Sequence, residues 1–441
     1  MNRTYYVRDF GAVGDGKTLD TEAIQKAIDT CAENGGGCVV LDGPFVYRAN
    51  TLFLKSNLVF QVEAETVLKC GDDRFAFPHD CFLYAEGEEN IVLAGDGVID
   101  GNYEAFLDVV SRYHKAGYQD RRPRLMILEK CRHISVRDLT MRGSTNWTCH
   151  MSGCEDVSIS NLRIVNDLAQ ANSDGIDLDH CRNVRIANCH ISCADDCIVF
   201  KNTRAHKEYG PCENITVTNC TLTSTSGAVK FGSESVSDFR NIIVTNCIIT
   251  DTNRALGLQL RDEGNIENVL FDNIIIDTRR FYDRYWGKAE PVYVTSLPRS
   301  PEKPSGSIRN VRFRNIIAHC ENGALIEGSP TGKVSGITLE SVKIVIGKHS
   351  KWEGGIYDRR PTYENEMVHD RTNGIRMVCA EDISLRDVEI EWEAETIQEY
   401  YGEALYAKNV KDLSLDHFRG KGAHDSDLGI LLENTSISEK E

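Results

Sequence analysis

The sequence has no apolar run that approaches the length of a membrane span, and residues Met1 to Tyr5 lack the apolar h-region of a secretory signal. It also has no linker rich in Pro, Ser or Gly that would divide its 441 residues. We therefore expect one domain, residues 1–441, located in the cytoplasm and without a membrane partner.

Positive charge is scarce, with 50 Lys and Arg against 67 Asp and Glu and a formal net charge of −17. A chain this acidic repels the phosphates of nucleic acids and of anionic lipids. We therefore expect no nucleic acid partner.

The sequence also lacks the paired CxxC motifs of a zinc site, so we expect no metal and no cofactor. Its 16 cysteines, without a signal peptide, indicate a reducing compartment rather than a disulfide framework. Several recur at equivalent places in a repeat, namely Cys131, Cys154, Cys181 and Cys212. We expect these small apolar thiols to stack in an interior column.

That repeat is a corner residue, usually Asn or Asp, followed by Val or Ile and then by alternating apolar and polar residues. The alternation is typical of a short strand with one buried face. The apolar members are spaced by 23 to 46 residues: Ile134, Val157, Val184, Ile215, Ile242, Val269, Val311, Ile337, Ile383 and Leu413. Propeller blades need units of about 40–50 residues, so the shorter steps favour the stacked coils of a parallel β-helix. The predicted fold class is all-β.

The N-terminal segment, residues 1–40, is expected to cap the open end of the coil stack. Asp20 and Thr21 can begin a helix that ends at the glycines 35–37. Its apolar face would consist of Ala23, Ile24, Ala27, Ile28 and Cys31.

Two steps of the repeat are unusually long, and we interpret them as loops inserted near the active face, residues 279–307 and 348–373. Both are rich in aromatic and charged residues, and long loops on a rigid scaffold often carry binding. They favour a closed, exo-type pocket, although each aromatic could equally cover the apolar face of a coil.

Three aspartates stand out. Asp174 precedes the pair Asp195 and Asp196 by 21 residues, about one coil. Coils stack about 4.8 Å apart, so the three carboxylates should crowd one patch. Like charges held so close favour retention of a proton on one group while another stays ionised. Hydrolysis of a glycosidic bond needs such an acid beside a base.

The same register places Trp147, Ser226 and Arg254 on roughly the face that carries the aspartates. Trp147 can stack on a sugar ring or simply pack between coils. His150 can orient a carboxylate or hydroxyl, although a histidine on a strand is often just satisfied by hydrogen bonds. Lys201 can contact substrate or cover an apolar edge.

The stretches Asn172–Asp177 and Ala194–Ile198, together with Asn146–His150, resemble glycoside hydrolase family 28, the polygalacturonase family, in its bacterial form. The resemblance implies a right-handed, single-stranded parallel β-helix and inverting hydrolysis without a metal. It assigns Asp195 as the general acid and Asp174 with Asp196 as the pair that activates water. Inversion in turn predicts carboxyl groups about 6.5–9.5 Å apart.

The sequence departs from that family at two places. Ser226 stands where the family has the histidine of Gly-His-Gly, although Gly232-Ser233-Glu234 still aligns. Gly257-Leu258-Gln259 replaces Arg-Ile-Lys, which binds the substrate carboxylate. We therefore expect an oligosaccharide substrate derived from plant cell walls, with a neutral or non-galacturonate terminal sugar.

The candidate substrate-binding residues are Asn172, Trp147, His150, Lys201, Ser226, Lys230, Glu234, Gln259 and Arg261. One alternative is a true exo-polygalacturonase in which Lys230 and Arg261 replace the missing cations. A second is a uronate lyase or epimerase with Lys230 or Tyr285 as the base. A third is a carbohydrate-binding solenoid without activity, against which the retained aspartates argue.

Overall fold

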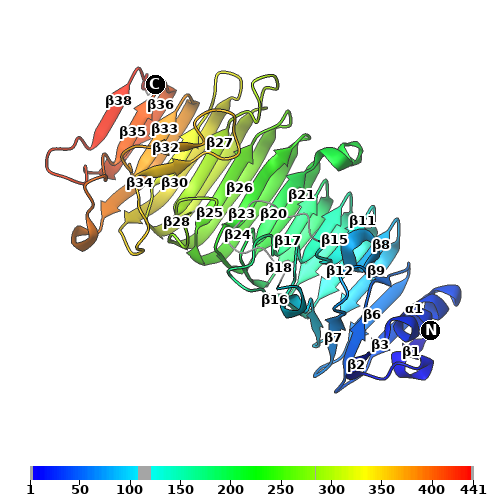
Figure 1. Ribbon diagram of the computed structural model, residues 1–441. Helices are drawn as coiled ribbons and strands as arrows, with labels where there is room; N and C mark the ends of the chain where they lie inside the picture. The colour runs from blue at the N-terminus through cyan, green and yellow to red at the C-terminus, as the bar shows by residue number, and fades with distance from the viewer. Residues whose placement is uncertain (1–2, 108–120, 284, 439–441) are drawn as a thin grey trace. The chain divides into compact units, whose positions relative to one another are not determined.

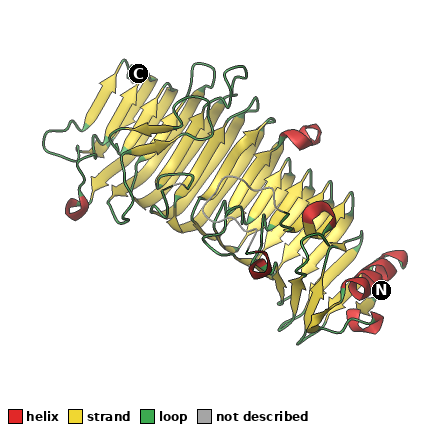
Figure 2. Ribbon diagram, viewed as in Figure 1, coloured by secondary structure: helices red, strands yellow, loops and turns green. Residues whose placement is uncertain are grey.

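The computed structural model describes residues 3–107, 121–283 and 285–438, which form two compact units, Met1–Ile198 and Val199–Glu441 (Figure 1). Both units are built from stacked β-strands, and helices are few and short (Figure 2). None of the helices in the described ranges is long and apolar enough to cross a membrane. Both units carry the same coil repeat. The assignment of residues 1–441 to one domain stays a prediction.

Each full coil of the first unit contributes three strands, and equivalent strands of successive coils pair in parallel. Ile91, Ile134, Val157 and Val184 are directly paired partners, so the predicted register of the repeat is confirmed in this unit. The first strands are β6 (Leu58–Val62), β9 (Glu89–Ala94), β12 (Arg132–Arg137), β15 (Glu155–Ser160) and β18 (Arg182–Ala187). The second strands are β7 (Val67–Cys70), β10 (Val98–Asp100), β13 (Thr140–Arg142), β16 (Arg163–Val165) and β19 (His190–Cys193). The third strands are β5 (Leu52–Phe53), β8 (Cys81–Glu86), β11 (Arg124–Glu129), β14 (Cys149–Ser152) and β17 (Ile176–Asp179).

In the second unit the first two strands of most coils merge into one long strand. Ile215, Ile242, Val269, Val311, Ile337, Ile383 and Leu413 are paired in succession, as predicted. The strands of this layer are β21 (Cys212–Thr218), β22 (Thr221–Ser224), β24 (Phe239–Thr252), β26 (Ile266–Thr278), β28 (Ile308–Cys320), β30 (Val334–Ile346), β34 (Glu381–Trp392), β36 (Lys411–Asp416) and β37 (Arg419–Gly420). The other layer contains β23 (Gly227–Ser235), β25 (Arg254–Leu260), β27 (Glu290–Ser296), β29 (Ala324–Glu327), β33 (Ile375–Val378), β35 (Leu405–Lys408) and β38 (Ile430–Glu433). Strand β20 (Ile198–Asn202) precedes β21 in the chain.

The asparagines of the repeat have a backbone role. Asn214, Asn241, Asn268 and Asn310 all adopt positive φ, between 51° and 58°. Asn tolerates this left-handed conformation better than most residues, which explains its recurrence at the corners. The side-chain amides of Asn241, Asn268 and Asn310 also donate to the asparagine one coil earlier, at 3.0, 3.2 and 2.7 Å.

All sixteen cysteines are free and fourteen are buried, as the predicted interior column requires. Cys154 Sγ donates to the Leu128 carbonyl at 3.2 Å, and Cys181 Sγ donates to the Met151 carbonyl at 3.2 Å. Burial raises the pKa of the Cys154 thiol well above its usual value, so the thiol stays protonated.

The cap consists of β1 (Thr4–Tyr6), β2 (Asp15–Leu19), β3 (Gly37–Leu41), β4 (Val46–Ala49) and helix α1 (Thr21–Glu33). The helix buries Ile24, Ala27, Ile28 and Cys31, as predicted. Asp20 is the N-cap residue, but its side chain does not cap the helix; its carboxylate accepts from the backbone N–H groups of Val13 and Gly14 instead. Gln25 bonds both the N–H and the carbonyl of Phe53, so α1 covers the open edge of β5.

The described residues also contain short 3₁₀ turns: Val7–Phe10, Pro78–Asp80, Tyr103–Phe106, Arg204–Tyr209 and Ala394–Thr396. The two predicted insertions need correction. Residues 279–307 are not one loop, because they contain β27, whose pairing with β25 extends the regular layer. Residues 348–373 contain a small antiparallel hairpin of β31 (Ile356–Asp358) and β32 (Met367–His369).

Candidate active site

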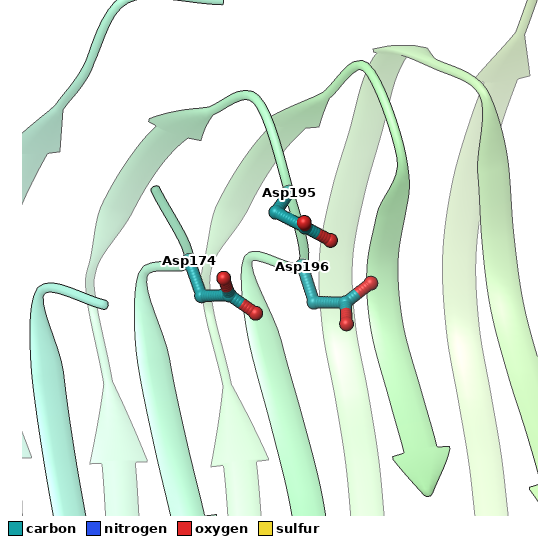
Figure 3. A group of neighbouring side chains, drawn as sticks. All are labelled: Asp174, Asp195 and Asp196. Atoms are coloured by element: carbon teal, nitrogen blue, oxygen red, sulfur yellow. The ribbon is translucent and has the colours of Figure 1, made fainter. Parts of the chain in front are cut away.

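Asp174, Asp195 and Asp196 converge in the first unit (Figure 3). One oxygen of each carboxylate lies within 4.8 Å of an oxygen of the other two. All three side chains are buried, with exposed fractions of 2, 6 and 1 %. The crowding expected from the spacing of one coil is therefore present.

Backbone pairing between adjacent turns brings the aspartates together. Gly175 N–H donates to the Asp196 carbonyl at 2.9 Å, and Ile176 N–H donates to the Cys197 carbonyl at 2.9 Å. A Cβ at Gly175 would lie 2.4 Å from the Cys197 carbonyl oxygen, so a glycine is needed for this close approach. Ser173 Oγ accepts from Ala194 N–H at 3.1 Å and ties the same two turns.

The separation of the carboxylates is shorter than expected. An inverting pair was predicted to stand about 6.5–9.5 Å apart, but the nearest oxygens lie within 4.8 Å of one another. The reason is local. Asp195 and Asp196 are consecutive, and Gly175, which follows Asp174, donates to the Asp196 carbonyl in the adjacent coil. The distance between these groups is thus no guide here to the stereochemical outcome.

Asn172 contacts Asp195 through its backbone rather than through its side chain. Its φ is 59°, and its backbone N–H donates to Asp195 Oδ2 at 3.3 Å. Its side-chain oxygen accepts from Arg122 at 3.3 Å. Arg122 also donates to the carbonyls of Thr145 and Ala171, at 2.9 and 3.1 Å, which ties together the loops of two coils.

Trp147 and His150 lie one coil from Asp174, whose carbonyl accepts from Thr148 N–H at 2.9 Å. The two rings meet edge to face with centroids 4.9 Å apart. The guanidinium of Arg124 lies 4.2 Å from the centroid of Trp147, and its Nη1 is 3.0 Å from His150 Nδ1. His150 Nε2 is 3.8 Å from Asp179 Oδ2, so the His150 ring lies between Arg124 and Asp179.

Arg122 and Arg124 were missing from the residues predicted to form the site. Their positions in the sequence did not reveal what they contact. Arg122 reaches residues up to 50 positions away in the chain, and only a folded coil stack brings those together.

The remaining candidates belong to the second unit. Ser226 is buried, and its carbonyl accepts from Arg254 N–H at 2.8 Å. Lys201 is buried, Lys230 is half-buried and Glu234 is exposed. Their roles in binding substrate stay predictions.

Gln259 and Arg261 are covered by the inserted hairpin region. The Gln259 amide donates to the Arg360 carbonyl at 3.1 Å. The Arg261 side chain is fully buried, and its guanidinium donates to Thr295 Oγ1 at 2.9 Å and to the Arg359 carbonyl at 3.0 Å. Arg261 is therefore a structural residue in this conformation, contrary to the expectation that it could replace a lost carboxylate clamp.

A buried ionic network holds this cover in place. Arg254 makes a two-pronged contact with Glu290 at 3.1 and 2.9 Å, and its guanidinium lies 3.5 Å from the centroid of Tyr293. Asp358 accepts from Gly287 N–H at 2.9 Å and from Arg360 at 2.7 Å. Tyr285, the second base considered for a lyase, is fully buried beside this network.

Among the described residues, the three aspartates are also the group whose geometry could hold a metal ion. Carboxylate oxygens are the ligands that Ca²⁺ and Mg²⁺ prefer. The same three groups can act without a metal as an acid and a water-activating pair, because one proton can be shared among them.

Comparison with known proteins agrees with this arrangement. The profile of glycosyl hydrolases family 28 matches residues 46–355, well over half of the chain. A probable polygalacturonase of Vitis vinifera is 29% identical over 253 residues, which are 51% of this chain and 50% of that protein. An exo-poly-alpha-D-galacturonosidase of Dickeya chrysanthemi is 23% identical over 52% of this chain and 47% of that protein. The chain thus spans about half the length of the curated relatives it matches.

Solved structures show the same fold. The exopolygalacturonase of Thermotoga maritima matches with a TM-score of 0.70 and 22% identity, over 89% of this chain and 92% of that chain. The family 28 exopolygalacturonase of Yersinia enterocolitica matches with a TM-score of 0.74 and 20% identity, over 94% and 79%. The predicted right-handed parallel β-helix is therefore confirmed. With its aspartate trio and this family match, the chain belongs to glycosyl hydrolases family 28.

Proposed function

We propose that the protein hydrolyses an O-glycosidic bond with inversion of the anomeric centre. The observation that carries hydrolysis is the buried trio of carboxylates within 4.8 Å of one another, whereas inversion rests on the match to glycosyl hydrolases family 28. Asp195 protonates the leaving oxygen, while Asp174 and Asp196 take a proton from the attacking water. The Asn172 N–H, which donates to Asp195 Oδ2, orients the acid.

Inversion is tested by proton NMR during hydrolysis of a substrate of known anomeric configuration. The anomer that appears first should be opposite to that of the substrate. A retained anomer, or a trapped glycosyl-enzyme, would exclude this mechanism.

We propose a neutral terminal sugar on a fragment of the plant cell wall as the substrate, removed by exo action in the cytoplasm. The Gly257-Leu258-Gln259 stretch lacks the two cations of the family pattern, and the Gln259 amide is bonded to the Arg360 carbonyl. A bidentate contact between arginine and carboxylate is strong and specific, so its loss weakens recognition of a galacturonate at that position. Two similar solved structures are those of exopolygalacturonases, which supports exo action.

An exo-polygalacturonase is the second candidate. The relatives are named for polygalacturonate, and Lys230 is a half-buried residue that pairs with Gly257 in the adjacent strand. Because the family is established, a lyase, an epimerase or a binding protein without activity is less well supported.

The experiment that separates the candidates is a panel of neutral and acidic oligosaccharides assayed for new reducing ends. We expect release of a monosaccharide from neutral substrates and negligible activity on polygalacturonate. Robust hydrolysis of digalacturonate that is abolished by Lys230→Ala would overturn the neutral assignment. An ultraviolet-absorbing unsaturated product would instead indicate a lyase.

A further inference from the structure

Arg122 lies against the segment that leads into Asp174, and it is buried, with an exposed fraction of 6 %. Its Nη1 donates to the carbonyls of Thr145 and Ala171 at 2.9 and 3.1 Å. Its Nη2 donates to Asn172 Oδ1 at 3.3 Å. A lysine has one nitrogen at its tip and cannot span these three acceptors, so the place requires the planar fork of an arginine.

The contact with Ala171 and the contact with Asp195 are made by one peptide group. The Ala171 carbonyl accepts from Arg122, and the Asn172 N–H at the other end of that planar group donates to Asp195 Oδ2 at 3.3 Å. In a trans peptide the two ends point in opposite directions, so the guanidinium and the carboxylate lie on opposite sides of it. Hydrogen bonds in such a chain polarise one another, and the cation therefore strengthens the N–H as a donor.

The placement of this peptide group is sensitive for two reasons. Asn172 has a φ of 59°, a left-handed conformation that is unfavourable for L-residues without support. At 3.3 Å its N–H contact also lies at the long end of N–H···O hydrogen bonds, so a small shift of the peptide breaks it. The hold of Arg122 on the Ala171 carbonyl thus controls the hydrogen bond to Asp195.

We propose that Arg122 is a positioning residue for the general acid and acts on Asp195 through the peptide group between Ala171 and Asn172. The N–H holds Oδ2 as the carbonyl oxygen of the protonated acid, which leaves the transferable proton on Oδ1. The proposal rests on the proposed function, in which Asp195 protonates the leaving oxygen. It adds the group that sets the direction in which the proton is delivered.

Asn166 offers a comparison, because it holds the same segment at a different point. It is buried, accepts from Ser144 N–H at 2.9 Å and donates to the Ser173 carbonyl at 3.1 Å. Its contacts reach Ser173 rather than the peptide that faces Asp195. Asn166→Ala should therefore loosen the segment without acting selectively on the acid.

The first test is Arg122→Lys in the full chain, assayed on a natural oligosaccharide and on a nitrophenyl glycoside. On the oligosaccharide kcat should fall by about 10²-fold with little change in KM, the usual size of a loss from misplaced reacting groups. The nitrophenyl glycoside should be little affected, because its leaving group needs little protonation. Arg122→Gln, which keeps a planar donor, should show the same split at a smaller loss, and Arg121→Lys, at the exposed neighbour, is the control. Equal losses on both substrates, or the same split in Asn166→Ala, would overturn the proposal.

A double-mutant cycle tests the route of the effect. In the Asp195→Asn protein the acidic proton is already absent, so Arg122→Lys should add little further loss on the oligosaccharide. A second loss of the full size would show that Arg122 acts elsewhere and would overturn the proposal.

Hydrogen exchange of the Asn172 amide needs no substrate and separates this proposal from the proposed function. Exchange should be faster in Arg122→Lys and in Asp195→Ala and unchanged in Arg121→Lys. That pattern supports the contact through the peptide even if no glycoside is cleaved, an outcome that would count against the proposed function alone. Exchange that is unchanged in Arg122→Lys would overturn the role of Arg122.

Discussion

At the scale of the residue, the proposed chemistry depends on three side chains that are buried and crowded. Asp174, Asp195 and Asp196 are held by turns that hydrogen-bond directly to one another through Gly175 and Ser173. A carboxylic acid poised beside carboxylates can deliver its proton when the leaving oxygen needs it. Mutations here should therefore change catalysis more than stability.

Asp195→Asn keeps the shape of the side chain but removes the acidic proton. We expect kcat to fall by about 10²–10⁴-fold on a natural oligosaccharide. The fall should be much smaller on a nitrophenyl glycoside, whose leaving group needs little protonation. Asp156→Asn, at an exposed corner of the same unit, is the control. Equal losses on both substrates would show that Asp195 is not the acid.

Asn172 offers a way to separate backbone conformation from side-chain contact. Asn172→Gly and Asn172→Ala both delete the hydrogen bond from Arg122, but alanine must also adopt the positive φ. We expect the free energy of unfolding of Asn172→Ala, measured by urea denaturation, to be about 1 kcal/mol lower than that of Asn172→Gly. Equal stability of the two variants would mean that the loop relaxes to another conformation.

At the scale of the element, the hairpin of β31 and β32 decides which residues of β25 are accessible. Its anchor is Asp358: burial opposes ionisation, but the hydrogen bond from Arg360 and the charges of Lys288 and Arg254 lower the pKa of Asp358 to about 2. A carboxylate whose pKa is lower in the folded state contributes stability above its unfolded pKa, near 3.8. That contribution is lost as the pH falls towards 2.

Asp358→Asn should therefore loosen the hairpin at neutral pH. Removal of one partner of a buried ion pair costs about 3–5 kcal/mol, because the remaining charges stay buried without compensation. Hydrogen exchange of the amides in residues 356–369 should accelerate, while exchange in the first unit stays the same. Asp412→Asn, at an exposed corner, is the control. Unchanged protection of the hairpin would show that Asp358 is not its anchor.

At the scale of the whole molecule, the buried thiols set the response to alkali and to thiol reagents. Burial raises the pKa of Cys31, Cys70, Cys81, Cys149 and Cys320. An acid with a higher pKa in the folded state stays protonated there after it has ionised in the unfolded chain. The stability that it contributes is complete below the unfolded pKa of about 9 and falls as the pH rises.

We expect the free energy of unfolding to fall above about pH 9, by up to about 1.4 kcal/mol per pH unit for each such thiol. A thiol reagent should titrate about two cysteines in the native protein, because Cys38 and Cys379 alone are not buried, and all sixteen in urea. Fewer than sixteen thiols in urea would reveal disulfides. A stability that is flat from pH 8 to pH 11 would contradict the alkaline prediction.

The sequence by itself determined the coil register and the aspartate trio, because both depend on local spacing. A corner that needs a left-handed residue, followed by alternating apolar residues, repeats wherever a coil begins. Each apolar member predicted in this way is paired as expected within its unit. Asp174 and Asp195 lie one turn apart, and a turn of the chain returns to the same face.

Only the tertiary structure decided what covers the coil faces. Arg261 was expected to be available to a substrate, but its guanidinium donates to the Arg359 carbonyl, 98 positions away. The Asp20 carboxylate accepts from the N–H groups of residues 13 and 14 and does not cap its own helix. Spacing in the sequence reports periodic, local geometry. The contacts of a long loop depend instead on desolvation and charge pairing, which arise only once the coils have stacked.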